Sequence, residues 1–147
     1  NYICRKDFGR EETNIDLISW AKEVQDRGAG ELILTSIDTD GTGKGFDLNI
    51  AEKISKHLKI PFILNGGIST LRHIEDILNV SNPSGIALGS VLHYNSIDEN
   101  FSKDLSSDGN VDFLKNKRNY KNFSKLSIKD IKRSLGKKFN LELNSHA

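Results

Sequence analysis

The chain alternates short apolar runs with segments in which apolar residues recur at helical spacing. Four apolar runs predict strands, over residues 1–4, 31–37, 62–65 and 85–90. Between them, spacings of three and four residues predict helices, over residues 15–28, 48–58 and 70–79. The second strand is mostly apolar, as expected for a strand that is buried on both faces. Because strands and helices alternate with short connections, the sequence predicts an α/β architecture with parallel strands and right-handed crossovers.

The first loop and the first helix carry recognisable boundary signals. Residues 5–14, RKDFGREETN, are predicted to form a polar loop, and Thr13 or Asn14 is a suitable cap for the helix that follows. Gly28 stands where the end of that helix needs a left-handed residue. We therefore expect the first helix to begin after the loop and to end before Gly28.

The last third of the chain has a different character. Residues 95–126 are polar, rich in Asn, Ser and Lys and weakly periodic, which predicts a surface insertion. Residues 127–138 return to helical spacing behind Ser127, a favourable cap, and residues 139–144 are expected to form a short terminal strand. The chain is thus expected to be a single domain, 1–147, with an insertion before its last helix.

Composition and charge exclude several classes of function. Hydrophobic residues make up 36% and charged residues 28% of the 147 residues, which is typical of a soluble globular protein. The formal net charge of +1 provides no overall field that would recruit nucleic acid or an anionic membrane. The single cysteine, Cys4, excludes an internal disulfide and fits a reducing compartment. No signal peptide and no apolar run of about 18 residues is found, so we expect a cytoplasmic protein.

Three glycine-containing motifs share one placement, because each directly follows a predicted strand. They are DTDGTGKG at 38–45, NGGIST at 65–70 and LGS at 88–90. In parallel α/β sheets, ligands bind at the carboxyl ends of the strands. Glycine there lets backbone N–H groups approach an anion, and a following helix N-terminus adds partial positive charge. The motifs predict a phosphate site, and the alternative is that each glycine serves only a turn.

These motifs also carry a resemblance to a known family. The stretches GAGELILTSIDTDGTGKGFD, NGGISTLRHIEDIL and GIALGSVLHY resemble the cyclase subunit of imidazole glycerol phosphate synthase, a (β/α)8 barrel of histidine biosynthesis. The resemblance is ordered from about Tyr2 to Tyr94 and resumes weakly over the expected final helix and strand. It implies that the chain is the C-terminal half of a TIM barrel, strands five to eight.

By this resemblance, most of the candidate site residues bind the phosphorylated substrate. Asp40 and Gly41 would lie beside a glycerol phosphate group, in the loop after strand six. The phosphate site would be completed by Gly67, Gly89 and Ser90. The barrel mouth would be lined by Thr35 and Ser36.

The sequence departs from the family pattern at several points. The resemblance places the two catalytic aspartates at the ends of strands one and five, before Asn1, so no catalytic residue is assigned and the chain alone is expected to be inactive. The first residue is not methionine, and we expect a fragment or a processed piece of a longer protein. Asn65 stands where a serine is more familiar. Glu31, by contrast, agrees with the family pattern: the resemblance implies that it belongs to the charged gate through which ammonia enters, and the alternative is a solvated charge or a stabilising salt bridge.

The resemblance implies a lyase (cyclase) that works in a heterodimer with a glutaminase subunit, which supplies ammonia. The substrate would be a phosphorylated ribonucleotide, cleaved to imidazole glycerol phosphate and an aminoimidazole carboxamide ribotide, with no metal or redox cofactor. One alternative is a paralogue that supplies ammonia for sugar amidation in surface-polysaccharide biosynthesis. Another is a non-catalytic half-barrel that binds phosphate or self-associates. The sequence leaves the pathway, the oligomeric state and the role of the insertion open.

Overall fold

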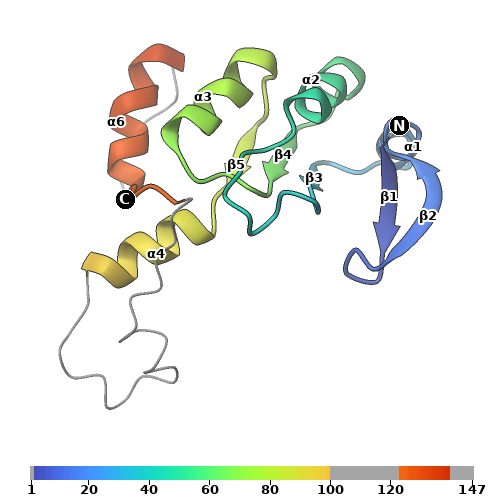
Figure 1. Ribbon diagram of the computed structural model, residues 1–147. Helices are drawn as coiled ribbons and strands as arrows, with labels where there is room; N and C mark the ends of the chain where they lie inside the picture. Colours follow the sequence, from blue (N-terminus) through green and yellow to red (C-terminus); the bar gives the residue numbers. More distant parts are fainter. Residues whose placement is uncertain (1, 100–122, 140–147) are drawn as a thin grey trace.

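A three-stranded parallel sheet forms the centre of the structure (Figure 1). The computed structural model describes residues 2–99 and 123–139. The strands are β3 (Leu32–Thr35), β4 (Phe62–Asn65) and β5 (Gly85–Ala87), in the order β3-β4-β5. Thr35 pairs with Asn65, and Asn65 pairs with Ala87, so the three carboxyl ends lie level at one edge. The α/β prediction with parallel strands is confirmed.

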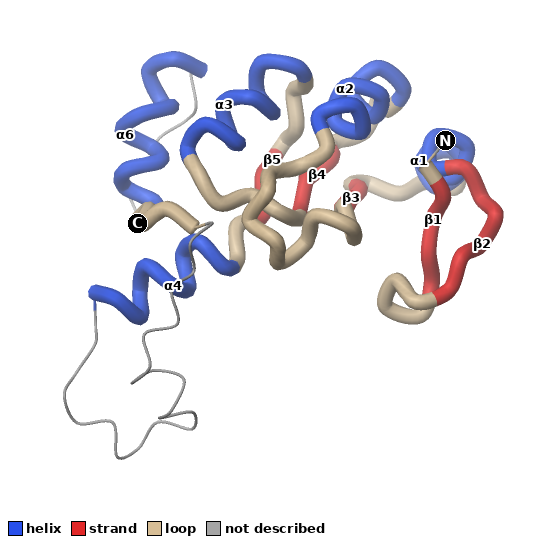
Figure 2. Tube along the Cα trace, viewed as in Figure 1, coloured by secondary structure: helices blue, strands red, loops and turns tan. Residues whose placement is uncertain are grey.

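Helices cover one face of this sheet. The structure places α2 (Leu48–His57), α3 (Leu71–Val80) and α6 (Ile128–Phe139) along the same side (Figures 1 and 2). The apolar core between these helices and the sheet contains fully buried side chains, among them Ile54, Leu64, Ile77 and Leu135. Burial of these residues holds the strands in register and fixes the loops at the strand ends.

The opposite face of β3 is open within the described part of the chain. Leu32 and Leu34 pack against the core, whereas Ile33, which alternates with them, is 65% exposed. The prediction that this strand is buried on both faces is therefore wrong for the described residues. Continuous apolar character indicates what a strand can bury, and it does not show that a covering layer is present.

The first strands form a separate antiparallel hairpin rather than part of the parallel sheet. The hairpin consists of β1 (Ile3–Lys6) and β2 (Glu11–Asp16). The predictions that 1–4 is a barrel strand and 5–14 a loop are corrected by this pairing. The charged residues that favoured a loop are cross-strand partners, with Arg5 bound to Glu12 at 2.7 Å and Lys6 to Glu11 at 2.8 Å.

Helix α1 (Leu17–Asp26) follows the hairpin directly. Its cap is Asp16, whose Oδ1 accepts from the Ser19 N–H at 3.0 Å. The prediction that Thr13 or Asn14 caps this helix is wrong. The Thr13 hydroxyl donates to the Cys4 carbonyl at 2.7 Å, and Asn14 lies inside β2 with φ of 58°. The predicted C-terminal glycine is confirmed, since Gly28 has φ of 94°.

The described residues include only the two ends of the insertion predicted at 95–126. Helix α4 (Ser90–Glu99) continues through the start of this range, and Leu126 near its end is buried. Residues 100–122 lie outside the described residues. The cap of the last helix is confirmed, because the Asp130 N–H donates to the Ser127 hydroxyl at 3.2 Å. The strand expected at 139–144 falls outside the described residues except for Phe139, which ends α6.

No helix within residues 2–99 and 123–139 is both long and apolar enough to cross a membrane.

Asp47 joins the hairpin to the helical layer, and its replacement tests this connection. Its Oδ1 caps α2 by accepting from the N–H groups of Asn49 (2.9 Å) and Ile50 (3.3 Å), while its Oδ2 accepts from the Tyr2 hydroxyl at 3.0 Å. We expect Asp47→Ala to lower the free energy of unfolding by about 1–2 kcal/mol, because the cap is lost. Tyr2→Phe, which removes one hydroxyl, should cost about 0.5–1.5 kcal/mol. Urea denaturation measures the free energy of unfolding of both variants. If Asp47→Ala is as stable as the parent, Asp47 does not act as a stabilising cap of α2.

Candidate functional site: an anion pocket at the carboxyl edge of the sheet

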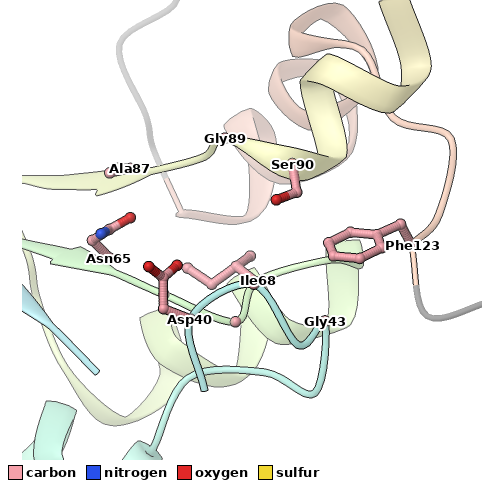
Figure 3. Close-up of a pocket in the computed structure, with 11 residues that line it drawn as sticks. Asp40, Gly43, Asn65, Ile68, Ala87, Gly89, Ser90 and Phe123 are labelled. Atoms are coloured by element: carbon pink, nitrogen blue, oxygen red, sulfur yellow. The ribbon is translucent and has the colours of Figure 1, made fainter. Parts of the chain in front are cut away.

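The loops that follow β3, β4 and β5 meet around one pocket at the carboxyl edge of the sheet (Figure 3). The pocket spans about 340 Å³, including space that is open to solvent. It is lined by Asp40, Gly41, Gly43, Asn65, Gly66, Gly67, Ile68, Ala87, Gly89, Ser90 and Phe123. Three separate glycine motifs of the sequence therefore contribute to a single cavity.

Most of the sequence-predicted binding residues lie in this lining. The structure brings together Asp40, Gly41, Gly67, Gly89 and Ser90. Two other predicted residues, Thr35 and Ser36, lie next to lining residues rather than in the lining. The Thr35 hydroxyl accepts from the side-chain amide of Asn65 at 3.1 Å. Ser36 is buried, and its carbonyl accepts from the Asp40 N–H at 2.9 Å, which begins the turn that places Asp40.

Gly66 and Gly67 allow two loops to touch through their backbones. Both have positive φ, 113° and 76°, which glycine adopts without strain. A Cβ at Gly66 would lie 2.8 Å from the Ser36 carbonyl oxygen, and a Cβ at Gly67 would collide with the carbonyl of Gly45. The Gly45 N–H donates to the Gly67 carbonyl at 2.8 Å. These two glycines therefore build the pocket wall, in addition to any role in binding.

Gly89 has a different environment, which leaves space for a ligand. The His93 N–H donates to the Gly89 carbonyl at 3.0 Å, so Gly89 occupies the cap position of α4 and Ser90 begins its first turn. A Cβ added at Gly89 would meet nothing within 4 Å. The first N–H groups of a helix have no intrahelical partner, and the helix dipole makes this end positive. This end of α4 is suited to bind an anion.

The polar side chains are distributed around the pocket rather than clustered. Figure 3 shows Asp40 and Asn65 toward one side, Phe123 on the other, and Ser90 with its hydroxyl directed into the space between them. Ser90 can donate a hydrogen bond to an anion, whereas an ionised Asp40 can only accept. The pocket can therefore take a ligand that carries an anionic group and a neutral hydroxyl.

Ser69 and His73 support this site from behind and were not identified from the sequence. Ser69 is fully buried, and its hydroxyl donates to the Gly43 carbonyl at 2.7 Å. Its N–H donates to Nδ1 of His73 at 3.3 Å, and the His73 ring packs against Gly45. Ser69 was visible within the NGGIST motif, but no pattern in the sequence indicates that it bonds across to the preceding loop.

Glu31 lies away from the pocket, at the amino end of β3. Its Oε1 accepts a hydrogen bond from the hydroxyl of Ser84 at 3.3 Å, just before β5. Glu31 is exposed there. Its predicted gate position is thus at the opposite end of the strands from the pocket.

No group of three or more His, Cys, Asp or Glu residues within the described ranges is placed to hold a metal ion.

Comparison with known proteins identifies the family. A family model described as "Histidine biosynthesis protein" matches residues 4–98. The chain therefore belongs to this family, and the resemblance to it is confirmed. The match includes the hairpin, the parallel strands and the glycine loops, and it ends before Phe123.

Individual relatives agree with this assignment. The chain is 42% identical over 90 residues to the imidazole glycerol phosphate synthase subunit HisF of Methanococcus vannielii, covering 61% of this chain and 33% of the relative. It is 47% identical over 85 residues to the subunit of that name from Prochlorococcus marinus (58% and 33%) and 45% identical over 89 residues to that from Trichormus variabilis (60% and 35%). The chain spans about a third of the length of the curated relatives it matches.

The half-buried imidazole of His73 predicts a dependence of stability on pH. Burial lowers the pKa of His73 from its ordinary value and outweighs the carboxylate of Asp76, which acts in the opposite direction. The folded state thus favours the neutral ring, and stability is greatest above about pH 6.5 and falls as the pH drops toward the lowered pKa. Protonation at Nδ1 would also remove the acceptor for the Ser69 N–H.

We expect His73→Gln to reduce the difference in unfolding free energy between pH 7.5 and pH 5.5, measured by urea denaturation. His57→Gln is the matched control, because His57 lies exposed at the end of α2. The same pH dependence in His73→Gln and in the parent would contradict the role of His73.

Proposed function

We propose that the three parallel strands correspond to strands six to eight of a (β/α)8 barrel, and that the chain is part of a cyclase subunit of imidazole glycerol phosphate synthase. The observation that carries this proposal is the pocket in which loops from three consecutive βα units converge with the N-terminus of α4. The similarity to HisF subunits over the same segment supports it. The open face of β3, with Ile33 exposed, fits a sheet that faces a barrel interior.

In this function the chain holds one phosphate group of the substrate. The anion is bound by the Ser90 hydroxyl and the backbone N–H groups of Gly67 and Gly89, with the positive end of the α4 dipole beneath it. Asp40 accepts a hydrogen bond from a substrate hydroxyl next to the phosphate. It contributes orientation rather than affinity for the anion, because a carboxylate and a phosphate repel each other.

Fixing the phosphate places the rest of a long substrate across the sheet edge, which lowers the entropic cost of reaction. Ammonia from a glutaminase partner would then enter from the amino end of the strands, past Glu31. Proton transfer is assigned to residues outside this chain, since the family resemblance places the catalytic aspartates before Asn1. Binding rather than turnover is therefore the appropriate test for the 147-residue chain.

A phosphate-binding module without catalysis is the second candidate. One observation favours it. Among the described residues that line the pocket, Asp40 is the one carboxylate, whereas acid–base catalysis commonly uses a pair of carboxylates. Both candidates require the same anion site.

Substitution at Gly89 tests this site directly. We expect Gly89→Val to abolish binding of glycerol phosphate in a calorimetric titration, because its side chain would fill the space in front of the α4 N-terminus. Folding should be retained, since a Cβ at Gly89 has no close neighbour. Ser90→Ala should weaken binding by about 1.5–3 kcal/mol, the contribution of one hydrogen bond to a charged group.

Gly30→Val provides the matched control. Gly30 likewise has open space around its Cβ position, but it precedes β3 at the other end of the sheet. The Gly30→Val variant should bind glycerol phosphate with the same affinity as the parent. If Gly89→Val also binds like the parent, the glycine motifs serve only as turns and the proposed site is wrong.

A further inference from the structure

Phe123 is the one aromatic side chain among the described residues that line the pocket, and it comes from outside the segment that matches the family. It belongs to the second described segment, 123–139, which precedes and includes α6. Its ring is half-buried and stands across the pocket from Asp40 and Asn65, beside Ser90 (Figure 3). The glycine motifs and the family resemblance assign it no role.

The backbone next to Phe123 is anchored to the loops that form the pocket. The Ser124 N–H donates to the Ser69 carbonyl at 3.0 Å. Through its hydroxyl, the same Ser69 binds the carbonyl of Gly43, another lining residue, at 2.7 Å. One fully buried residue therefore connects the loop after β3, the loop after β4 and the segment that carries Phe123.

The ring itself is held by α4. Phe123 meets Tyr94 edge-on, with ring centroids 5.4 Å apart and an interplanar angle of 65°. Tyr94 lies four residues after Ser90, so both project from the same face of the helix whose N-terminus points at the pocket. Leu126, which is 7% exposed, fixes the segment further along. The position of Phe123 is thus determined before a ligand arrives.

A phenyl ring at this position offers the anion no hydrogen bond. Its effect is to exclude water from the side of the pocket near Ser90 and the α4 N-terminus. Hydrogen bonds and charge interactions are stronger where water is excluded and the local dielectric is lower. The donors of the pocket would then bind a phosphate more tightly than the same donors on an open surface.

We propose that Phe123 is a further binding residue of this site, a wall that shields the phosphate group of the ligand from water and so sets its affinity. The inference rests on the proposed anion site and adds to it a residue from beyond the family-matched segment. It concerns the phosphate group, so inorganic phosphate is a sufficient probe.

The experiment compares the affinity for inorganic phosphate of the parent with that of Phe123→Ala and Phe123→Leu. Phe8→Ala is the matched aromatic control, because Phe8 lies at the hairpin turn and is 98% exposed. Phe123→Ala should raise the dissociation constant by about fivefold to tenfold, because water would enter the pocket and weaken its hydrogen bonds and charge interactions with the phosphate. Phe123→Leu keeps an apolar wall, so its dissociation constant should stay within about twofold of the parent value. The dissociation constant of Phe8→Ala should equal that of the parent.

Phe123→Gln keeps the inference testable if the alanine variant does not melt cooperatively. Glutamine is similar in size to leucine but carries polar atoms that attract water. The affinity of Phe123→Gln for phosphate should therefore be about fivefold below that of Phe123→Leu. Equal affinities for the leucine and glutamine variants, or parent-like binding by Phe123→Ala, would overturn the role of Phe123. Failure of the parent to bind phosphate would instead overturn the proposed function itself.

Discussion

The pocket depends on one close approach, in which the loop after β3 and the loop after β4 touch backbone to backbone. Gly66 and Gly67 make this possible, because any Cβ at either position would strike a carbonyl group of the opposing loop. The hydrogen bonds from Gly45 to Gly67 and from Ser69 to Gly43 close the contact. If the loops were held apart, Asp40 and the N-terminus of α4 would no longer face a common space.

The parallel sheet makes this contact possible by bringing three loops to one edge. Register between β3, β4 and β5 is fixed by the burial of one face under α2 and α3, so the strand ends lie level and the connecting loops converge. In the site that we propose, the binding chemistry comes mainly from backbone groups rather than from charged side chains. Such a site can recognise a phosphate without a cluster of basic residues, which agrees with a chain whose formal net charge is +1.

Much of the central fold could be predicted from the sequence, because buried strands and amphipathic helices have distinct apolar spacing. The strands at 62–65 and within 31–37 and the helices that follow them lie close to where the pattern places them. The hairpin could not be found in this way, because its charged residues form cross-strand pairs such as Arg5 with Glu12 and have the composition of a loop. Polar character alone does not distinguish an exposed hairpin from a loop.

The parts of the candidate site in which glycine follows a strand could be predicted from the sequence. The residues whose positions are determined by contacts between distant segments were missed. Gly67, Gly89 and Ser90 lie in motifs with a local physical meaning. The position of Phe123 depends on a hydrogen bond between segments that are distant in sequence, from Ser124 to Ser69, and the His73 ring meets Gly45 of the preceding loop. No local pattern reports such a bond, and the polar sequence around Phe123 indicated an insertion instead.

The central claim is that backbone N–H groups at the carboxyl edge of the sheet bind a phosphate. Nuclear magnetic resonance of the amide groups during a titration with glycerol phosphate tests it most directly. The claim predicts that the largest and saturable shifts occur at the amides of Gly67, Gly89 and Ser90, with small changes in the hairpin of β1 and β2. Shifts that are absent from these three amides, or that are largest elsewhere in the chain, would contradict it.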